Sequence, residues 1–65
     1  MNLLITFINV ETAQMIKILY GDKLFIPNVK KITFNPTTIQ WETKSRHDGY
    51  SLDIIKHIEI FENEP

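Results

Sequence analysis

The chain has 65 residues and a formal net charge of −1, a length that accommodates one domain at most, because domains typically span about 50–250 residues. Hydrophobic residues make up 43% of it and charged residues 23%, which excludes a disordered chain, and the small net charge argues against a strongly basic nucleic-acid binder and against an acidic DNA mimic. The absence of cysteine excludes disulfides, thiolate zinc sites and a cysteine nucleophile.

The composition favours β-structure. Eleven Ile, two Val and six Thr stand against a single Ala, and stiff β-branched side chains suit pleated sheets better than helices. Lys outnumbers Arg six to one, a bias that the AT-rich genome of a low-GC bacterium or one of its phages would produce.

The first segment, 2–9, is predicted to be a strand with apolar residues on both faces. Leu3, Ile5 and Phe7 alternate with Leu4 and Ile8, a pattern typical of a strand covered on both sides. The segment lacks the basic start and the cleavage site of a signal peptide. No stretch approaches the roughly 20 apolar residues of a membrane span, so we expect a cytoplasmic protein.

The next two segments are predicted to be strands at 13–20 and 23–35, after a turn at 10–12. A helix competes for 13–20, because Met15, Ile18 and Leu19 also fit a helical stripe. The turn signal that follows at 21–23 favours a hairpin. Within 23–35, Pro27 cannot donate to a β-ladder and predicts a sharp bend.

The second half of the chain is predicted to hold two more strands, at 37–44 and 49–61. They are separated by the polar loop Ser45–Gly49, which ends in an Asp-Gly hairpin signal. Alternation in the last strand is interrupted at Asp53–Lys56, which predicts a second bend. Residues 62–65 are expected to be a frayed tail.

These segments predict an all-β fold, a five-stranded antiparallel meander with two bent strands that curls strongly or closes as an SH3-like barrel. We expect one domain over 1–65. The residues in phase with its core are Ile5, Phe7, Ile16, Ile18, Leu24, Ile26, Ile32, Phe34, Ile39, Trp41, Leu52, Ile58 and Ile60. The two bent segments, 24–34 and 50–60, share an apolar pattern at an offset of 26 residues. Either a duplication or two bends of the same kind would produce it.

Several apolar residues remain outside that core phase. They are Leu4, Ile8, Met15, Leu19, Phe25 and Phe61. Grouped on the surface, they would mark an interface with another protein or with a second copy of the chain; alternatively, tight curling buries both faces of strand 2–9. The preferred hypothesis is a non-catalytic accessory or regulatory protein that binds protein through this surface and can self-associate as a homodimer.

A nucleic-acid-binding barrel is the alternative hypothesis. Basic and aromatic residues interleave around one loop, the combination with which small barrels bind single strands. These residues are Trp41, Lys44, Arg46, His47 and Tyr50. The competing interpretation places Trp41 and Tyr50 inward, in phase with Ile39 and Leu52, and makes the loop cations a solubilising tip.

The sequence shows no recognisable set of catalytic or metal-binding residues. The two histidines, His47 and His57, lie ten residues apart on different segments, whereas a metal site needs three or four converging ligands. Both glycines fall in predicted turns rather than in a phosphate-binding loop. We therefore expect neither an enzyme nor a cofactor.

Overall fold

The protein, described here by a computed structural model over residues 1–15 and 21–62, consists mainly of β-strands in two sheets. The strands are β1 (Asn2–Phe7), β2 (Lys23–Ile26), β3 (Lys31–Phe34), β4 (Thr38–Glu42), β5 (His47–Ser51) and β6 (Ile55–Phe61). The helical elements are α1 (Val10–Met15) and the single 3-10 turn η1 (Leu52–Ile54). The prediction of an all-β protein is confirmed.

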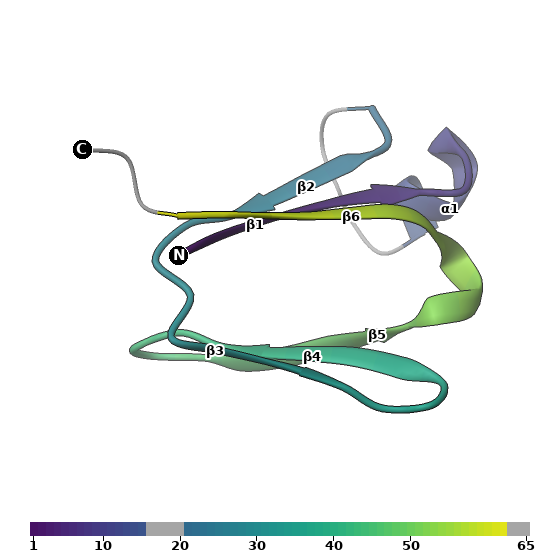
Figure 1. The fold of residues 1–65 in the computed structure, drawn as a ribbon. Helices are drawn as coiled ribbons and strands as arrows, with labels where there is room; N and C mark the ends of the chain where they lie inside the picture. Colours follow the sequence, from purple (N-terminus) through teal and green to yellow (C-terminus); the bar gives the residue numbers. More distant parts are fainter. Residues whose placement is uncertain (16–20, 63–65) are drawn as a thin grey trace.

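The two sheets are antiparallel, have three strands each and face one another as layers (Figure 1). One has the order β2-β1-β6 and the other β3-β4-β5. The first strand therefore lies between the second and the last, whereas a meander places first and last strands at opposite edges. A single five-stranded meander is not confirmed: the described residues form six strands, because both bends divide a predicted strand in two and the segment predicted as a strand at 13–20 begins as a helix.

The segment after β1 is a helix, so the predicted turn at 10–12 and strand at 13–20 are wrong at least as far as residue 15. Asn9 begins this helix: its side-chain Oδ1 accepts a hydrogen bond from the Thr12 N–H at 2.7 Å, and its backbone oxygen accepts one from Ala13 at 3.3 Å. An Asn at this position satisfies N–H groups that a first helical turn leaves free. Residues 16–20, with Ile16 and Ile18, lie outside the described residues.

The bend predicted at Pro27 is confirmed, and it carries the chain from the first sheet to the second. After Pro27, Asn28 takes a left-handed conformation with φ 56°, which Asn tolerates better than most residues. Val29 then exchanges backbone hydrogen bonds with Met1, and the Lys30 N–H donates to the Glu42 oxygen at 2.8 Å. Two consecutive residues thus bond to different layers.

The turn between β4 and β5 lies earlier than its Asp-Gly signal predicts. It closes between Thr43 and Arg46, where the Thr43 N–H donates to the Arg46 oxygen at 2.8 Å and the Arg46 N–H donates to the Thr43 hydroxyl at 3.2 Å. Asp48 and Gly49 lie inside β5 instead, where Gly49 is opposite Gln40.

The interruption predicted at Asp53–Lys56 begins slightly earlier, with η1, which returns the chain to the first sheet. The Ser51 hydroxyl accepts from the Asp53 N–H at 3.3 Å and caps this turn. The Leu52 N–H donates to the Thr37 oxygen at 2.8 Å. No helix in the described ranges is long and apolar enough to cross a membrane.

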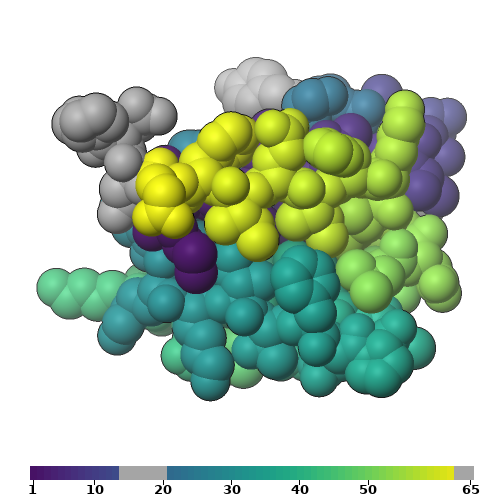
Figure 2. All heavy atoms as spheres, in the orientation of Figure 1, coloured from purple at the N-terminus to yellow at the C-terminus, as the bar shows by residue number. Residues whose placement is uncertain are grey.

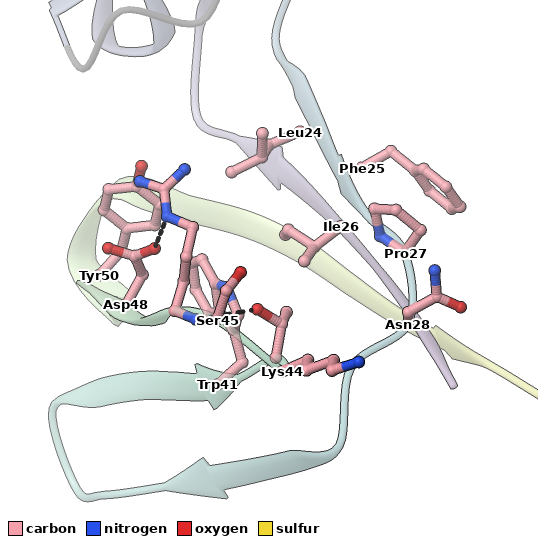
Figure 3. Close-up of a pocket in the computed structure, with 12 residues that line it drawn as sticks. Leu24, Phe25, Ile26, Pro27, Asn28, Trp41, Lys44, Ser45, Asp48 and Tyr50 are labelled. Carbon is pink, nitrogen blue, oxygen red and sulfur yellow. Dashed lines mark hydrogen bonds and ion pairs between the residues drawn. The ribbon is translucent and has the colours of Figure 1, made fainter.

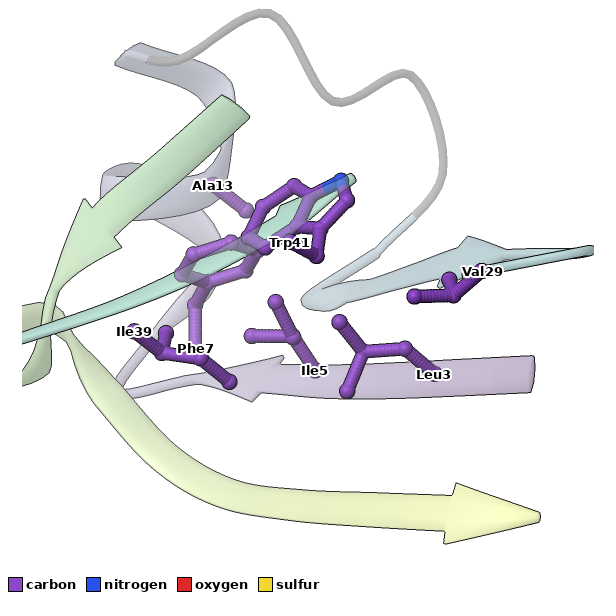
Figure 4. Packing of buried hydrophobic residues seen from close by; sticks show 7 residues of the cluster. All are labelled: Leu3, Ile5, Phe7, Ala13, Val29, Ile39 and Trp41. Carbon is purple, nitrogen blue, oxygen red and sulfur yellow. The ribbon is translucent and has the colours of Figure 1, made fainter. Parts of the chain in front are cut away.

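The core lies between the central strands of the two sheets (Figure 4). Its buried residues are Leu3, Ile5, Phe7, Ala13, Val29, Ile39 and Trp41. Phe34 and Ile60, both expected in the core, are 56% and 47% exposed. They share faces with Ile39 and Leu3, but they belong to the edge strands β3 and β6, where the opposite layer covers them less.

Candidate functional site

The outer face of the sheet β2-β1-β6 carries exposed apolar side chains. Phe25 lies directly opposite Leu4 across the β1–β2 ladder, and Phe61 lies opposite Asn2 across the β1–β6 ladder. Because alternate residues of a strand share a face, Leu4, Phe25 and Phe61 point to the same side, away from the core. Phe25 is 54% exposed, Phe61 is exposed and Leu4 is half-buried. We call these three residues the apolar face.

The outer face of the other sheet is polar. By register and alternation, its residues are Lys31, Thr33, Thr38, Gln40, Glu42, His47, Gly49 and Ser51. We call these eight residues the polar face, and none of them is a large hydrophobic residue. The outer faces of the two sheets therefore differ: one exposes apolar side chains and the other is polar. The exposed apolar side chains are the feature that a function has to explain.

The structure brings together three of the six residues predicted to form an interface, namely the apolar face. Ile8 is also exposed but lies beyond the end of β1, where its N–H donates to the Ile54 oxygen at 3.0 Å. Met15 ends α1, and its side chain is not described; Leu19 lies outside the described residues. Phe34, Ile60 and Val10 are further exposed apolar residues that the sequence pattern did not place on the surface.

A groove of about 540 Å³ opens between β2 and the β4–β5 hairpin (Figure 3). Leu24 and Ile26 point into it from β2, toward Trp41 and Tyr50, whereas Phe25 points to the other side of the strand. Its rim is polar and includes Asn28, Thr43, Lys44, Ser45, Arg46 and Asp48. Four of the five residues of the nucleic-acid hypothesis thus line one groove.

The aromatic residues of this groove are mutually packed rather than free. Trp41 is only 4% exposed. Its ring centroid lies 5.5 Å from that of Tyr50 at a 49° tilt, and Tyr50 makes an edge-to-face contact with Phe7, also at 5.5 Å. A buried indole offers no open face on which a base can stack, so the inward interpretation of Trp41 is confirmed.

The basic residues around the hairpin diverge in direction. The Arg46 Nε lies 3.4 Å from the Asp48 Oδ2 in an exposed ion pair, which offsets part of the positive charge at the rim. His47 lies opposite Glu42 on the polar face, on the other side of β5 from Tyr50. The fifth residue of the nucleic-acid hypothesis is therefore separated from the other four.

The two histidines remain apart in the fold. His47 belongs to β5 and His57 to β6, in different sheets. The His57 Nε2 lies 3.6 Å from the Glu59 Oε1 on the outer side of β6. Across residues 1–15 and 21–62, no group of three His, Asp or Glu side chains could hold a metal ion.

Tyr50 supplies a pH-dependent property of the groove. Burial raises the pKa of its hydroxyl above the usual value, the Asp48 carboxylate raises it further, and Arg46 acts in the opposite direction. A raised pKa in the folded state means that the neutral phenol stabilises the fold and that ionisation favours unfolding.

We expect the free energy of unfolding to fall as the pH rises past about 10, the ordinary tyrosine value, and to fall less steeply in Tyr50→Phe. Urea titrations of both proteins across that range measure the difference. In the tyrosinate absorbance titration, Asp48→Asn should move the Tyr50 midpoint to lower pH. A Tyr50 midpoint at or below the ordinary value would contradict the assignment.

Comparisons with protein-family models, with curated proteins and with solved structures found no match for this chain. The surfaces of the two sheets are therefore the only guide to function.

Proposed function

We propose that this chain is a small non-catalytic module that binds protein through the apolar face, as an accessory or regulatory protein. The observation that carries the proposal is that Phe25 is exposed and lies directly opposite Leu4 on the outer face of its sheet. The outer face of the other sheet is polar. Burying a phenylalanine side chain stabilises a complex by about 1.5–3 kcal/mol, and exposed aromatic groups are typical anchors of protein interfaces.

We further propose that the fold is a variant of the SH3-like barrel. Two observations support this classification: each bent segment begins in one sheet and ends in the other, and a 3-10 turn joins the last two strands. Small barrels of this kind present their loops and strand edges to partners, which fits a module that works by binding.

Nucleic-acid binding is the less supported function. Its stacking platform would have to use Trp41, which is buried, and its basic side chains are divided between the groove, with Lys44 and Arg46, and the polar face, with His47. Counterion release needs several phosphate contacts, and Arg46 already pairs with Asp48.

Affinity capture with a matched pair of variants tests the proposal. Phe25→Glu places a charge on the apolar face, and Thr33→Glu places the same charge at an exposed edge-strand position on the polar face. We expect wild type and Thr33→Glu to recover the same partner protein in equal amounts from nuclease-treated lysate. Phe25→Glu should recover at least tenfold less of that protein, because an aromatic hot spot contributes about 2 kcal/mol or more.

Equal recovery by all three proteins would contradict the assignment of the surface. Recovery that disappears on nuclease treatment would favour the nucleic-acid alternative. Circular dichroism of each variant shows whether the fold is retained, so that loss of capture is not confused with unfolding.

A further inference from the structure

The outer edge of β6 is an unusual feature of so small a sandwich. Within residues 1–15 and 21–62, β6 is the longest strand, and it pairs with β1 on one side only. Proteins usually protect such edges with proline, short strands, bulges or charged side chains, above all Lys, and β6 has one such device, a bulge at Lys56. The single irregularity of this ladder lies at its start, between His57 and Ile55, and the pairing from His57 to Phe61 is regular. The second half of β6 is therefore suited to accept another strand.

Both faces of this edge carry apolar groups that the fold leaves uncovered. Ile58 and Ile60 point to the inner side of the sheet, yet Ile60 is half-exposed, and Phe61 is exposed on the outer side. Phe34, the most exposed of the large hydrophobic residues described, lies on β3. β3 and β6 occupy the same side of the molecule, which Figure 2 shows in teal and yellow.

The other three edges are less suitable. β2 and β3 have four residues each, and β2 is followed directly by Pro27, which cannot donate to a ladder. β5 has a glycine at its centre and polar residues along its outer face. β6 alone combines length, regular pairing and uncovered apolar side chains.

We propose that β6 pairs antiparallel with β6 of a second copy of this chain, centred on Ile58, so that two sheets join into one of six strands. The inference goes beyond the proposed function, because it adds a second contact, at the β6 edge, with a second copy of the chain as the partner. Strand addition supplies backbone hydrogen bonds, and a two-fold axis makes one strand complementary to itself only if its side chains match in reverse order.

The polar side chains of β6 favour this register. With Ile58 opposite its symmetry mate, His57 lies opposite Glu59 of the other copy, and the symmetry repeats the pair. A shift that centres the pairing on Glu59 places two carboxylates opposite each other. A histidine ring N–H can donate a hydrogen bond to a carboxylate, whereas like charges directly opposite each other destabilise an antiparallel ladder. Both side chains are exposed, and the His57 Nε2 lies 3.6 Å from the Glu59 Oε1 of its own copy, so the pairing would exchange this contact for two contacts across the junction.

In this register the Ile58 side chains of the two copies meet on the inner side of the junction, and each Ile60 lies diagonal to Ile58 of the other copy. On the outer side, the His57–Glu59 pairs lie between the two apolar faces. Phe25 lies on β2, at the opposite edge of the same sheet, so it remains available to a different partner.

Charge steering tests the pairing without disturbing the core. The variant His57→Glu makes both positions acidic, and the double variant His57→Lys, Glu59→Lys makes both basic. We expect wild type to sediment as a dimer at micromolar to millimolar concentrations. Each variant alone should dissociate with a Kd at least tenfold higher, and an equal mixture of the two should form a mixed dimer in native mass spectrometry. A monomeric wild type, or variants with the wild-type Kd, would overturn the proposal.

Single cysteines test the register, since the chain has none of its own. Opposite residues lie about 4.5–5.5 Å apart between Cα atoms, within the span of a disulfide, whereas diagonal neighbours lie about 7–8 Å apart. His57→Cys mixed with Glu59→Cys should therefore oxidise to a crosslinked dimer, and either variant alone should not. A crosslink in the single variants, or none in the mixture, would overturn the pairing about Ile58.

The two proposals can fail separately. Phe25→Glu should leave the sedimentation of the dimer unchanged, because β2 lies at the far edge of the sheet, while it abolishes capture of a protein partner. A change in dimerisation with Phe25→Glu would place the contact on the apolar face instead of on the β6 edge and would overturn the proposed pairing.

Discussion

A Phe7→Ala variant is expected to be largely unfolded at 25 °C, whereas Phe34→Ala should keep nearly all of the wild-type stability. Both substitutions remove the same atoms from a phenylalanine at the inner face of a strand. Truncation of a buried phenylalanine costs about 3–5 kcal/mol. A chain of this size without disulfides or metal rarely has more than about 3–5 kcal/mol of total stability, so the loss at Phe7 is comparable with the whole.

The position of Phe7 explains the size of this effect. Its side chain is fully buried, and its ring meets Tyr50 edge to face at 5.5 Å. Tyr50 in turn packs against Trp41, so the three rings connect β1 of one layer with β4 and β5 of the other. Removing the Phe7 ring opens a cavity between the layers, and the neighbouring rings lose their packing as well.

Phe34 provides the matched control. It is 56% exposed on an edge strand, so its removal takes away little buried surface, and we expect a loss of at most about 0.5–1 kcal/mol. Urea unfolding followed by circular dichroism measures both variants at a low protein concentration, where self-association contributes little. Equal destabilisation of the two variants would contradict the described packing between the layers.

The fold class and the two bends followed from residues whose effect is local. Pro27 cannot donate to a ladder, and the apolar alternation stops at Asp53–Lys56, so both interruptions are legible in the sequence. Strand 38–42 was equally clear because Ile39 and Trp41 alternate with Gln40 and Glu42. Each of these predictions depends on two or three neighbouring residues.

The sequence was less informative wherever long-range pairing decides the outcome. That β1 lies between β2 and β6 depends on the layers packing together, and local alternation cannot distinguish this order from a meander. The helix α1 depends on one cap, Asn9, at the end of a strongly β-like segment. The β-branched composition of the chain favours a strand there instead.

The candidate surfaces show the same division. Alternation placed Leu4, Phe25 and Phe61 away from the core correctly, because phase within a strand sets the face. Alternation did not predict that Phe34 and Ile60 are exposed despite their inward phase, since exposure at a sheet edge depends on how far the opposite layer extends. The edge of β6 was therefore recognised only in the structure.

The two glycines are expected to resist substitution for opposite reasons, which Gly49→Ala and Gly21→Ala separate. A Cβ at Gly49 would lie 2.8 Å from the Ile39 backbone oxygen and 2.9 Å from the Gln40 Cγ. The Gln40 side chain can move, but the oxygen belongs to the neighbouring strand β4. The β4–β5 ladder must then shift, and we expect Gly49→Ala to cost about 2–3 kcal/mol, in the range of overpacking in a well-packed region.

Gly21 has open space around it and a φ of +59°. Its constraint is therefore conformational: an alanine in the left-handed region costs roughly 1–2 kcal/mol. Asparagine tolerates this region, and the chain already uses it in that way at Asn28. Gly21→Asn should therefore recover most of the stability lost in Gly21→Ala.

At position 49 the same asparagine should be worse than alanine, because it is larger and the obstacle there is steric. Urea unfolding of the four variants provides the comparison: asparagine improves on alanine at 21 and is inferior to it at 49. The opposite order at position 49 would mean that β5 does not approach β4 as closely as described. The turn would then return to Asp48-Gly49, where the sequence signal had placed it, and Tyr50 would lose the register that directs its ring toward Phe7 and Trp41.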